Sequence, residues 1–278
     1  MRNPRIDQSK SFLFVPGSKP ERFDKAFSSN ADAVIIDLED AVSPEQKDQA
    51  RNAVTDWVTA NRRVIVRVNG RGTPWFERDA LLGRLPGVAG IILPKAESAA
   101  DVTTLVSLVK AKIRVFPLIE SAQGLWNAIE IAKAPFVQKL LFGTLDFMVD
   151  MNMELANEEL NTFRVQLAMA SRVAGIGAPI DGVTTCLEDT EHVKRDALNG
   201  KRWGFSGKLC IHPRQVEVVN QCYVSSETEI AWAQRVIDAS RDAMGAAVSV
   251  DGKMVDRPLV LHAQRILEMS GERQGIES

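Results

Sequence analysis

Cysteine is scarce in this sequence, and the cysteines present are poorly placed for cross-linking or for binding zinc. There are three, Cys186, Cys210 and Cys222, and none has the CxxC spacing of a metal or redox motif. Three thiols cannot all pair with one another. A disulfide framework and a zinc site are therefore disfavoured, and we expect buried, reduced thiols.

An excess of charge and long apolar runs are also missing. The net charge of −2 and the isoelectric point near 6.0 provide no general attraction to nucleic acid or to an acidic membrane. Any anionic ligand must be held by local lysine and arginine. The apolar run at residues 11–15 is too short for a signal peptide, and no stretch is long enough to cross a membrane. We expect a cytoplasmic protein without nucleic-acid or membrane partners.

The 278 residues contain eight short apolar runs bounded by turn signals, which is typical of strands. Segments with apolar residues at helical spacing lie between them, at 44–60, 99–110, 125–134 and 158–174. Apolar strands alternating with amphipathic helices indicate a parallel sheet buried on both faces. Eight such units predict an α/β fold, a (β/α)8 TIM barrel, with an open doubly wound sheet as the alternative. The predicted strands are residues 11–15, 33–38, 64–68, 90–93, 113–119, 139–143, 178–183 and 208–211.

After the eighth predicted strand the chain continues with two more helical segments, at residues 227–244 and 259–269. Between them, SVDGKMVDRP contains the turn signal Asp251-Gly252. We therefore predict a catalytic barrel domain over residues 1–222 and a C-terminal helical extension over residues 223–278.

Polar side chains follow most of the predicted strands at their C-terminal ends, where catalytic groups gather in such barrels. Any one of them could be a helix N-cap or part of a surface ion pair. Seven strand ends with polar groups together favour a site at one mouth. The residues are Asp37, Glu39, Asp40, Arg67, Asn69, Lys95, Glu97, Glu120, Asp146, Asp181 and His212.

Two of these carboxylates suggest a metal site. Glu120 and Asp146 end neighbouring predicted strands, so they could share one hard divalent cation. Mg²⁺ prefers one or two carboxylates, with substrate oxygens and water completing the octahedron. No cluster of histidine and cysteine indicates zinc. The alternative is that Glu120 caps a helix starting near Ser121.

Two cationic features each allow two interpretations from the residues alone. Arg67, at the end of VIVRVN, needs an anionic partner if it is buried. That partner could be Asp37 or Glu39, or a substrate carboxylate held by two hydrogen bonds. The first loop has Lys19, Arg22 and Lys25 around a glycine turn before a helix. These cations suit a phosphate-bearing ligand, or are solvated surface charge.

Taken together, the motifs resemble the citrate lyase beta subunit / HpcH-HpaI aldolase family of acyl-CoA carbon–carbon lyases. The resemblance covers nearly the whole chain, and DLEDAV and the pair IESAQG and FGTLDF are its most specific parts. In chain order the motifs are SFLFVPGSKPERFDKA, DAVIIDLEDAV, VRVN, LPKAE, PLIESAQGLWNAIEIA, FGTLDFMVD, GFSGKLCIHPRQ and GKMVDRP.

The resemblance implies a TIM barrel with a C-terminal extension, assembled as a homotrimer or a dimer of trimers. It implies Mg²⁺ bound by Glu120 and Asp146, and a substrate-binding role for Arg67. It also implies that a neighbouring subunit's C-terminal segment supplies an aspartate, here Asp256. Coenzyme A is expected at the first loop and at the IHP segment, through Phe14, Lys19, Lys25, Ile211 and His212.

The reaction implied is cleavage of a 3-hydroxyacyl-CoA, of the citramalyl-CoA or malyl-CoA type, to acetyl-CoA and a 2-oxo acid, or the reverse condensation. Arg67 and Asp256 are the expected catalytic groups. The group that takes the hydroxyl proton stays open between a carboxylate of residues 37–40, with Glu39 as the candidate, and water on the metal. The alternatives are a citrate lyase beta subunit acting in a multi-subunit complex and a non-catalytic CoA-binding barrel.

Overall fold

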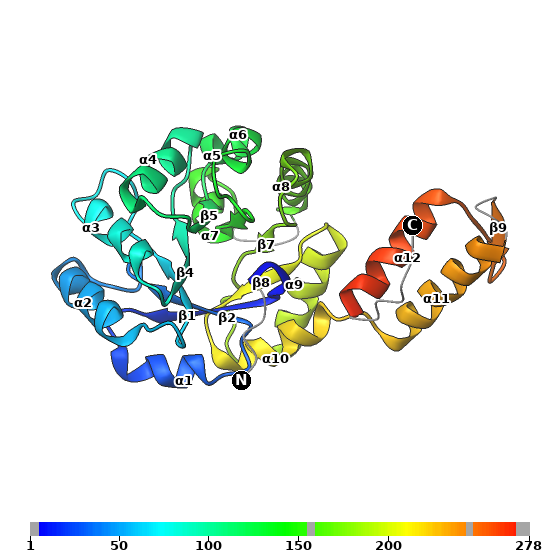
Figure 1. Ribbon diagram of the computed structural model, residues 1–278, viewed down its shortest axis with the longest axis horizontal. Helices are drawn as coiled ribbons and strands as arrows, with labels where there is room; N and C mark the ends of the chain where they lie inside the picture. Colours follow the sequence, from blue (N-terminus) through cyan, green and yellow to red (C-terminus); the bar gives the residue numbers. More distant parts are fainter. Residues whose placement is uncertain (1–5, 155–158, 243–246, 271–278) are drawn as a thin grey trace. The chain divides into compact units, whose positions relative to one another are not determined.

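The computed structural model describes residues 6–154, 159–242 and 247–270. The chain forms two compact units, Met1–Tyr223 and Val224–Ser278. The first unit is a closed barrel of eight parallel strands that pair in chain order, with β8 next to β1 (Figure 1). The predicted (β/α)8 fold is confirmed, and the open sheet is excluded. The strands are β1 Ser11–Pro16, β2 Ala33–Asp37, β3 Val64–Arg67, β4 Val88–Leu93, β5 Arg114–Ile119, β6 Leu141–Phe142, β7 Ile180–Asp181 and β8 Gly207–Cys210.

Strand alternation separates the barrel's two cores. Every second residue of a strand faces the same side of the sheet. One apolar cluster fills the barrel interior, and the residues between its members belong to the larger cluster beneath the helices. The interior cluster consists of Phe12, Ala33, Ile35, Ile65, Ile92, Phe116, Leu118, Leu141, Ile180 and Leu209.

Helices surround the barrel (Figure 1). The predicted helix at 44–60 is a short 3₁₀ turn, Pro44–Gln46, followed by α2, Lys47–Trp57. The segment predicted at 125–134 is covered only in part, by the end of α5, Ala122–Trp126, and by α6, Ala128–Ala132. Glu158, where another helix was predicted to start, lies outside the described residues. Helices α3, α7, α9 and α10 were not predicted. The helices are α1 Phe23–Phe27, α2 Lys47–Trp57, α3 Phe76–Ala80, α4 Ala99–Val109, α5 Ala122–Trp126, α6 Ala128–Ala132, α7 Thr144–Asp150, α8 Asn161–Ala174, α9 Thr190–Arg202 and α10 Pro213–Cys222.

The second unit is a helix pair with a small hairpin. Helices α11, Glu227–Asp242, and α12, Arg257–Ser270, lie side by side in Figure 1. Strands β9, Val248–Val250, and β10, Lys253–Val255, pair antiparallel around the predicted Asp251-Gly252 turn. Both turn residues have positive φ, 52° and 76°, the conformation for which an Asp-Gly pair is favoured in a two-residue hairpin. Residues 243 and 244, predicted as helix, lie outside the described residues.

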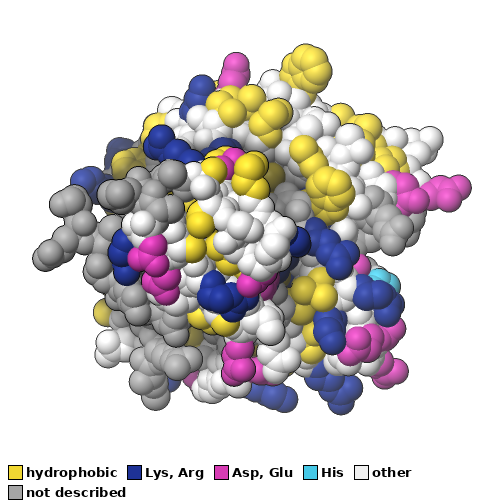
Figure 2. Space-filling model, turned by 90° about the vertical axis from the view of Figure 1, so that its right-hand side faces the viewer, with side chains coloured by type: hydrophobic (Ala, Val, Ile, Leu, Met, Phe, Trp, Pro, Cys, Tyr) yellow, Lys and Arg dark blue, Asp and Glu magenta, His cyan; other side chains and the backbone are white. Residues whose placement is uncertain are grey.

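The surface has mixed charge. On the face drawn in Figure 2, lysine and arginine side chains lie among acidic and uncharged ones. This distribution agrees with the net charge of −2. Among the described residues, no helix is long and apolar enough to cross a membrane.

Candidate active site

The C-terminal mouth of the barrel is polar because of the same strand alternation. Two positions after interior residues of β2, β3 and β5 come Asp37, Arg67 and Glu120. Asp37 and Arg67 are also direct neighbours in the β2–β3 register. All three side chains therefore point into the barrel at its C-terminal end, as the sequence predicted.

Glu120 is a buried carboxylate held by the main chain of the neighbouring strand end. The residue is 4% exposed, and its Oε1 accepts a hydrogen bond of 2.6 Å from the Lys95 backbone N–H. The cap of α5 is Ser121, whose hydroxyl accepts from the Gly124 backbone N–H. Glu120 is thus not a helix cap, and that alternative is excluded.

Asp146 lies close enough to Glu120 for their charges to interact. Strand β6 ends at Phe142, so Asp146 is in the first turn of α7 rather than at a strand end. That part of the sequence interpretation was wrong. Burial raises the pKa of Glu120 to about 8, and the negative charge of Asp146 adds to the shift. A cation between the two carboxylates would relieve both effects.

Space beside Glu120 is kept open by Gly143. A Cβ atom at this position would come within 2.8 Å of Glu120 Oε2 and 2.6 Å of its Cβ. Any side chain here would therefore crowd the oxygen that the Lys95 N–H leaves free. Within the described residues, no group of three or more histidine, cysteine or acidic side chains is arranged to hold a metal. The candidate metal site is the carboxylate pair.

Arg67 pairs with Asp37, one of the partners that the sequence left open. Its Nε and Nη2 donate to the two Asp37 carboxylate oxygens, at 2.6 Å each. Although burial opposes the shift, the Asp37 charge and these hydrogen bonds raise the pKa of Arg67 above its usual value. The guanidinium also lies 4.9 Å from the centre of the Phe14 ring. Nη1, 3.1 Å from Asp40 Oδ2, is the part of the fork that does not contact Asp37.

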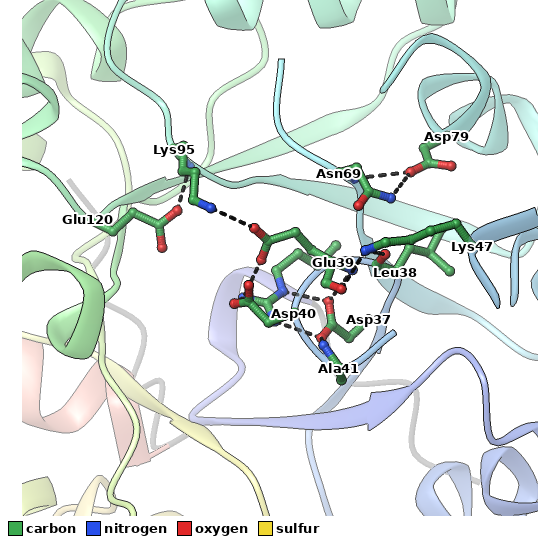
Figure 3. Close-up of polar contacts among 11 residues, drawn as sticks. Asp37, Leu38, Glu39, Asp40, Ala41, Lys47, Asn69, Asp79, Lys95 and Glu120 are labelled. Atoms are coloured by element: carbon green, nitrogen blue, oxygen red, sulfur yellow. Dashed lines mark hydrogen bonds and ion pairs between the residues drawn. The ribbon is translucent and has the colours of Figure 1, made fainter. Parts of the chain in front are cut away.

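Glu39 lies between two cations. Its Oε2 is 3.2 Å from Arg67 Nη1, and its Oε1 is 3.2 Å from Lys95 Nζ. Burial is the largest cause of the raised pKa of this carboxyl. Figure 3 shows the Lys95 side chain extending toward Glu39 while its main chain faces Glu120. One residue therefore connects the two carboxylates.

The backbone of the acidic loop is fixed by a buried lysine that the sequence analysis did not identify. Lys47 of α2 donates from Nζ to the carbonyl oxygens of Leu38 and Glu39, at 2.8 and 2.6 Å. Because Lys47 is buried, the pKa of its ammonium is lowered. Nothing in the helical pattern of residues 44–60 distinguishes this lysine from a surface one. Its role depends on the loop above it.

The residues expected to bind coenzyme A lie at one edge of the mouth or on its first loop. Leu13 pairs with Cys210 across β1 and β8, so Phe14, the next residue of β1, and Ile211, which directly follows β8, are close. Lys19 and Lys25 are exposed on the loop and on α1. His212 is the N-cap of α10, where its Nδ1 accepts from the Arg214 backbone N–H at 3.2 Å.

Family models match most of this chain. The model described as HpcH/HpaI aldolase/citrate lyase matches residues 10–213. The chain belongs to this family. A second model, for a carbon–carbon bond lyase of the TIM-barrel fold, matches residues 167–271. The family expected from the motifs is therefore confirmed, and the second match extends into the C-terminal unit.

Named relatives align over nearly the whole length of this chain. The chain is 36% identical to the citrate lyase subunit beta of Leuconostoc mesenteroides subsp. cremoris, with 100% of this chain and 98% of the relative aligned. It is 35% identical to a (3S)-malyl-CoA thioesterase of Cereibacter sphaeroides, with 93% of each aligned. The structure of CitE from Mycobacterium tuberculosis in complex with magnesium, acetoacetate and coenzyme A has a TM-score of 0.84 and 35% identity. It covers 96% of this chain and 100% of its own.

Asp256 belongs to the second unit of this family member. It is exposed and directly precedes α12. Its backbone carbonyl accepts from the N–H groups of Leu259 and Val260, at 3.1 Å each. Within the described residues its carboxylate accepts no hydrogen bond, so the side chain does not cap α12.

Proposed function

We propose that this protein is a Mg²⁺-dependent lyase that cleaves a carbon–carbon bond in a 3-hydroxyacyl-CoA of the citramalyl-CoA or malyl-CoA type. The products are acetyl-CoA and a 2-oxo acid, and the reverse condensation uses the same groups. The observation that supports this best is the Glu120–Asp146 carboxylate pair at the same mouth as Arg67 and Glu39. The related CitE structure, with magnesium, acetoacetate and coenzyme A, supports the same ligand classes.

The carboxylate pair fits a magnesium ion. Glu120 is buried beside a second negative charge, which a divalent cation would offset. The missing side chain at Gly143 leaves room at Glu120 Oε2. When bound, the ion polarises substrate oxygens as a Lewis acid. Its remaining ligands are then substrate and water, as Mg²⁺ prefers.

Side chains of this protein accept and donate the protons and stabilise the negative charge. Glu39 accepts the proton of the substrate hydroxyl. The bond between the hydroxyl carbon and the carbon next to the thioester then breaks. Its electron pair passes to the thioester enolate, and the hydroxyl oxygen becomes the ketone oxygen of the oxo acid. Arg67 offsets the negative charge as it moves. Asp256 supplies a proton to the enolate carbon, and both carboxyl groups then exchange protons with solvent.

Coenzyme A lies in this proposal across the β8–β1 edge of the mouth. Phe14 and Ile211 contact the thiol end, because they directly follow the paired residues Leu13 and Cys210 of β1 and β8. Lys19 and Lys25 are exposed cations on the first loop and α1, and they contact the phosphates. His212 lies at the start of α10, directly after Ile211. These two lysines can contact the phosphates although the protein has no net positive charge.

A homo-oligomer, built on a trimer, completes the proposed site with Asp256 of a neighbouring subunit. The outer surface of the barrel supports an assembly. Helix α8 exposes Val165, Met169 and Val173, which lie on one face because they are four residues apart. Trp126 on α5 is 87% exposed. Exposed apolar surface of this kind is typical of protein–protein contacts.

Cleavage of citramalyl-, malyl- and citryl-CoA by the purified protein alone tests the proposed function. We expect Mg²⁺-dependent release of acetyl-CoA from citramalyl- or malyl-CoA without any second protein. Activity only on a thioester attached to a carrier protein would favour the role of the Leuconostoc relative, a citrate lyase beta subunit. Binding of coenzyme A with no turnover of any thioester would make the chain a non-catalytic barrel.

Asp256→Asn is expected to fold and to bind coenzyme A, yet to lose most carbon–carbon cleavage. Mixing it with Arg67→Ala should restore part of the activity, because hybrid oligomers contain sites with both groups intact. Asp251→Asn, in the turn of the hairpin that precedes Asp256 and paired with Arg235 at 2.7 Å, is the matched control and should keep its activity. The measurement is the rate of acetyl-CoA release after subunit exchange. No recovery after verified exchange would exclude a shared site.

A further inference from the structure

Lys95 has an unusual backbone for a residue at the mouth of the barrel. It follows β4 and has a φ of +50°. A side chain with a Cβ atom disfavours this left-handed conformation, because the Cβ crowds the following carbonyl oxygen. Residues held in such conformations occur preferentially at functional sites. The strain is therefore a reason to ask what Lys95 contacts.

The turn at Lys95 places two different groups near two different carboxylates. Its backbone N–H donates to Glu120 Oε1 at 2.6 Å, which holds the proposed metal ligand in place. Its ammonium is 3.2 Å from Glu39 Oε1. Figure 3 shows these two contacts on opposite sides of the residue. The ammonium thus lies between the proposed metal site and the acidic loop.

Lys95 differs from the other two cations that contact this loop within the described residues. Lys47 is buried and donates to two carbonyl oxygens. The Arg67 side chain is 11% exposed and uses its fork on Asp37. The Lys95 side chain is 60% exposed, so a ligand in the mouth can reach its ammonium. The Glu39 side chain is 9% exposed and its Oε2 lies 3.2 Å from Arg67 Nη1, so this carboxylate keeps a cationic partner when the Lys95 ammonium turns to a ligand.

We propose that Lys95 is a substrate-binding residue whose ammonium leaves Glu39 to pair with the substrate carboxylate. This inference rests on the proposed function, because the carboxylate is the one on the hydroxyl-bearing carbon, held beside Glu120. Arg67 already uses two of its nitrogens on Asp37. The proposal therefore gives the contact with the substrate carboxylate to Lys95. The backbone N–H of the same residue keeps Glu120 oriented. The two roles are separable by substitution.

The test compares Lys95→Met with Lys95→Gly. Methionine removes the ammonium and keeps an unbranched chain, whereas glycine removes it and favours the left-handed backbone. Pyruvate binding in the presence of Mg²⁺, measured by titration calorimetry, is the main readout because it needs no turnover. Both variants should bind pyruvate about 10-fold to 100-fold more weakly, the worth of a charge-assisted hydrogen bond. Mg²⁺ binding and coenzyme A binding should change less than about 2-fold in the glycine variant.

Lys110→Met is the matched control. Lys110 is another exposed lysine with a left-handed backbone, at φ +53°, but it ends α4 away from the mouth. Its replacement should leave pyruvate binding unchanged. Unchanged pyruvate affinity in Lys95→Met would overturn the inference, and so would an equal loss of coenzyme A affinity. Wild-type protein that binds pyruvate but cleaves no thioester would overturn the proposed reaction instead, while a weakened Lys95→Met would still support the contact.

Discussion

Replacing Glu120 by glutamine is expected to lower kcat/KM by roughly 10³-fold, because several kcal/mol of charge stabilisation depend on the metal. The amide keeps an oxygen for the Lys95 N–H but cannot bring a negative charge to a cation. Mg²⁺ should bind much more weakly, since Asp146 would be the remaining protein carboxylate at the site. Stability should not fall, because the wild-type carboxylate is buried beside like charge. Steady-state kinetics over a Mg²⁺ series, with thermal unfolding, measures both effects.

Glu97→Gln is the control for this prediction. Glu97 lies in the same loop region, is exposed and accepts a hydrogen bond from the Ser121 hydroxyl at 2.7 Å. Its replacement should leave the Mg²⁺ dependence unchanged. Full activity of Glu120→Gln at sub-millimolar Mg²⁺ would show that the carboxylate pair is not the metal site.

Arg67→Lys should be nearly as damaging as Arg67→Ala, with both variants losing most of the activity. A compact ammonium cannot reproduce the fork that donates 2.6 Å hydrogen bonds to both Asp37 oxygens, although it keeps the charge. Breaking a buried ion pair costs about 3–5 kcal/mol, so the free energy of unfolding should also fall. Turnover is therefore measured at a temperature where circular dichroism shows each variant to be folded.

Because Arg67 pairs with Asp37 in the structure, the Lys variant can separate a structural role of Arg67 from a catalytic one. If Arg67 only anchors Asp37, the folded Lys variant should be less stable but turn over at a near-normal rate. If Arg67 also offsets charge on the substrate, turnover falls in the folded protein as well. Arg71→Lys is the control, since Arg71 forms a half-exposed pair with Asp101 at 2.6 Å and should tolerate the change.

The fold and the positions of the main site residues could be predicted because both depend on local periodicity. Apolar strands buried on both faces identify the barrel, and the two-residue period places Asp37, Arg67 and Glu120 inside it. The register between β2 and β3 then makes Asp37 and Arg67 neighbours. These inferences need no knowledge of side-chain conformation.

Other features depend on contacts that the sequence does not encode locally. Strand β6 ends four residues before Asp146, because α7 starts directly after Gly143. Whether Arg67 pairs with Asp37 or with a ligand is decided by side-chain geometry. The buried Lys47 and the left-handed Lys95 become visible only when the loop they contact is in place. The proposed role of Asp256 depends on an assembly of subunits, which one chain does not encode locally.

The most direct test of the whole account is the product balance of one reaction by the purified protein with Mg²⁺. With malyl- or citramalyl-CoA as substrate, acetyl-CoA and the 2-oxo acid are quantified by mass spectrometry together with free coenzyme A. Carbon–carbon cleavage predicts acetyl-CoA and oxo acid in equal amounts, with little free coenzyme A. Free coenzyme A and an intact hydroxy acid would contradict the account, because they are the products of the thioester hydrolysis for which the Cereibacter relative is named.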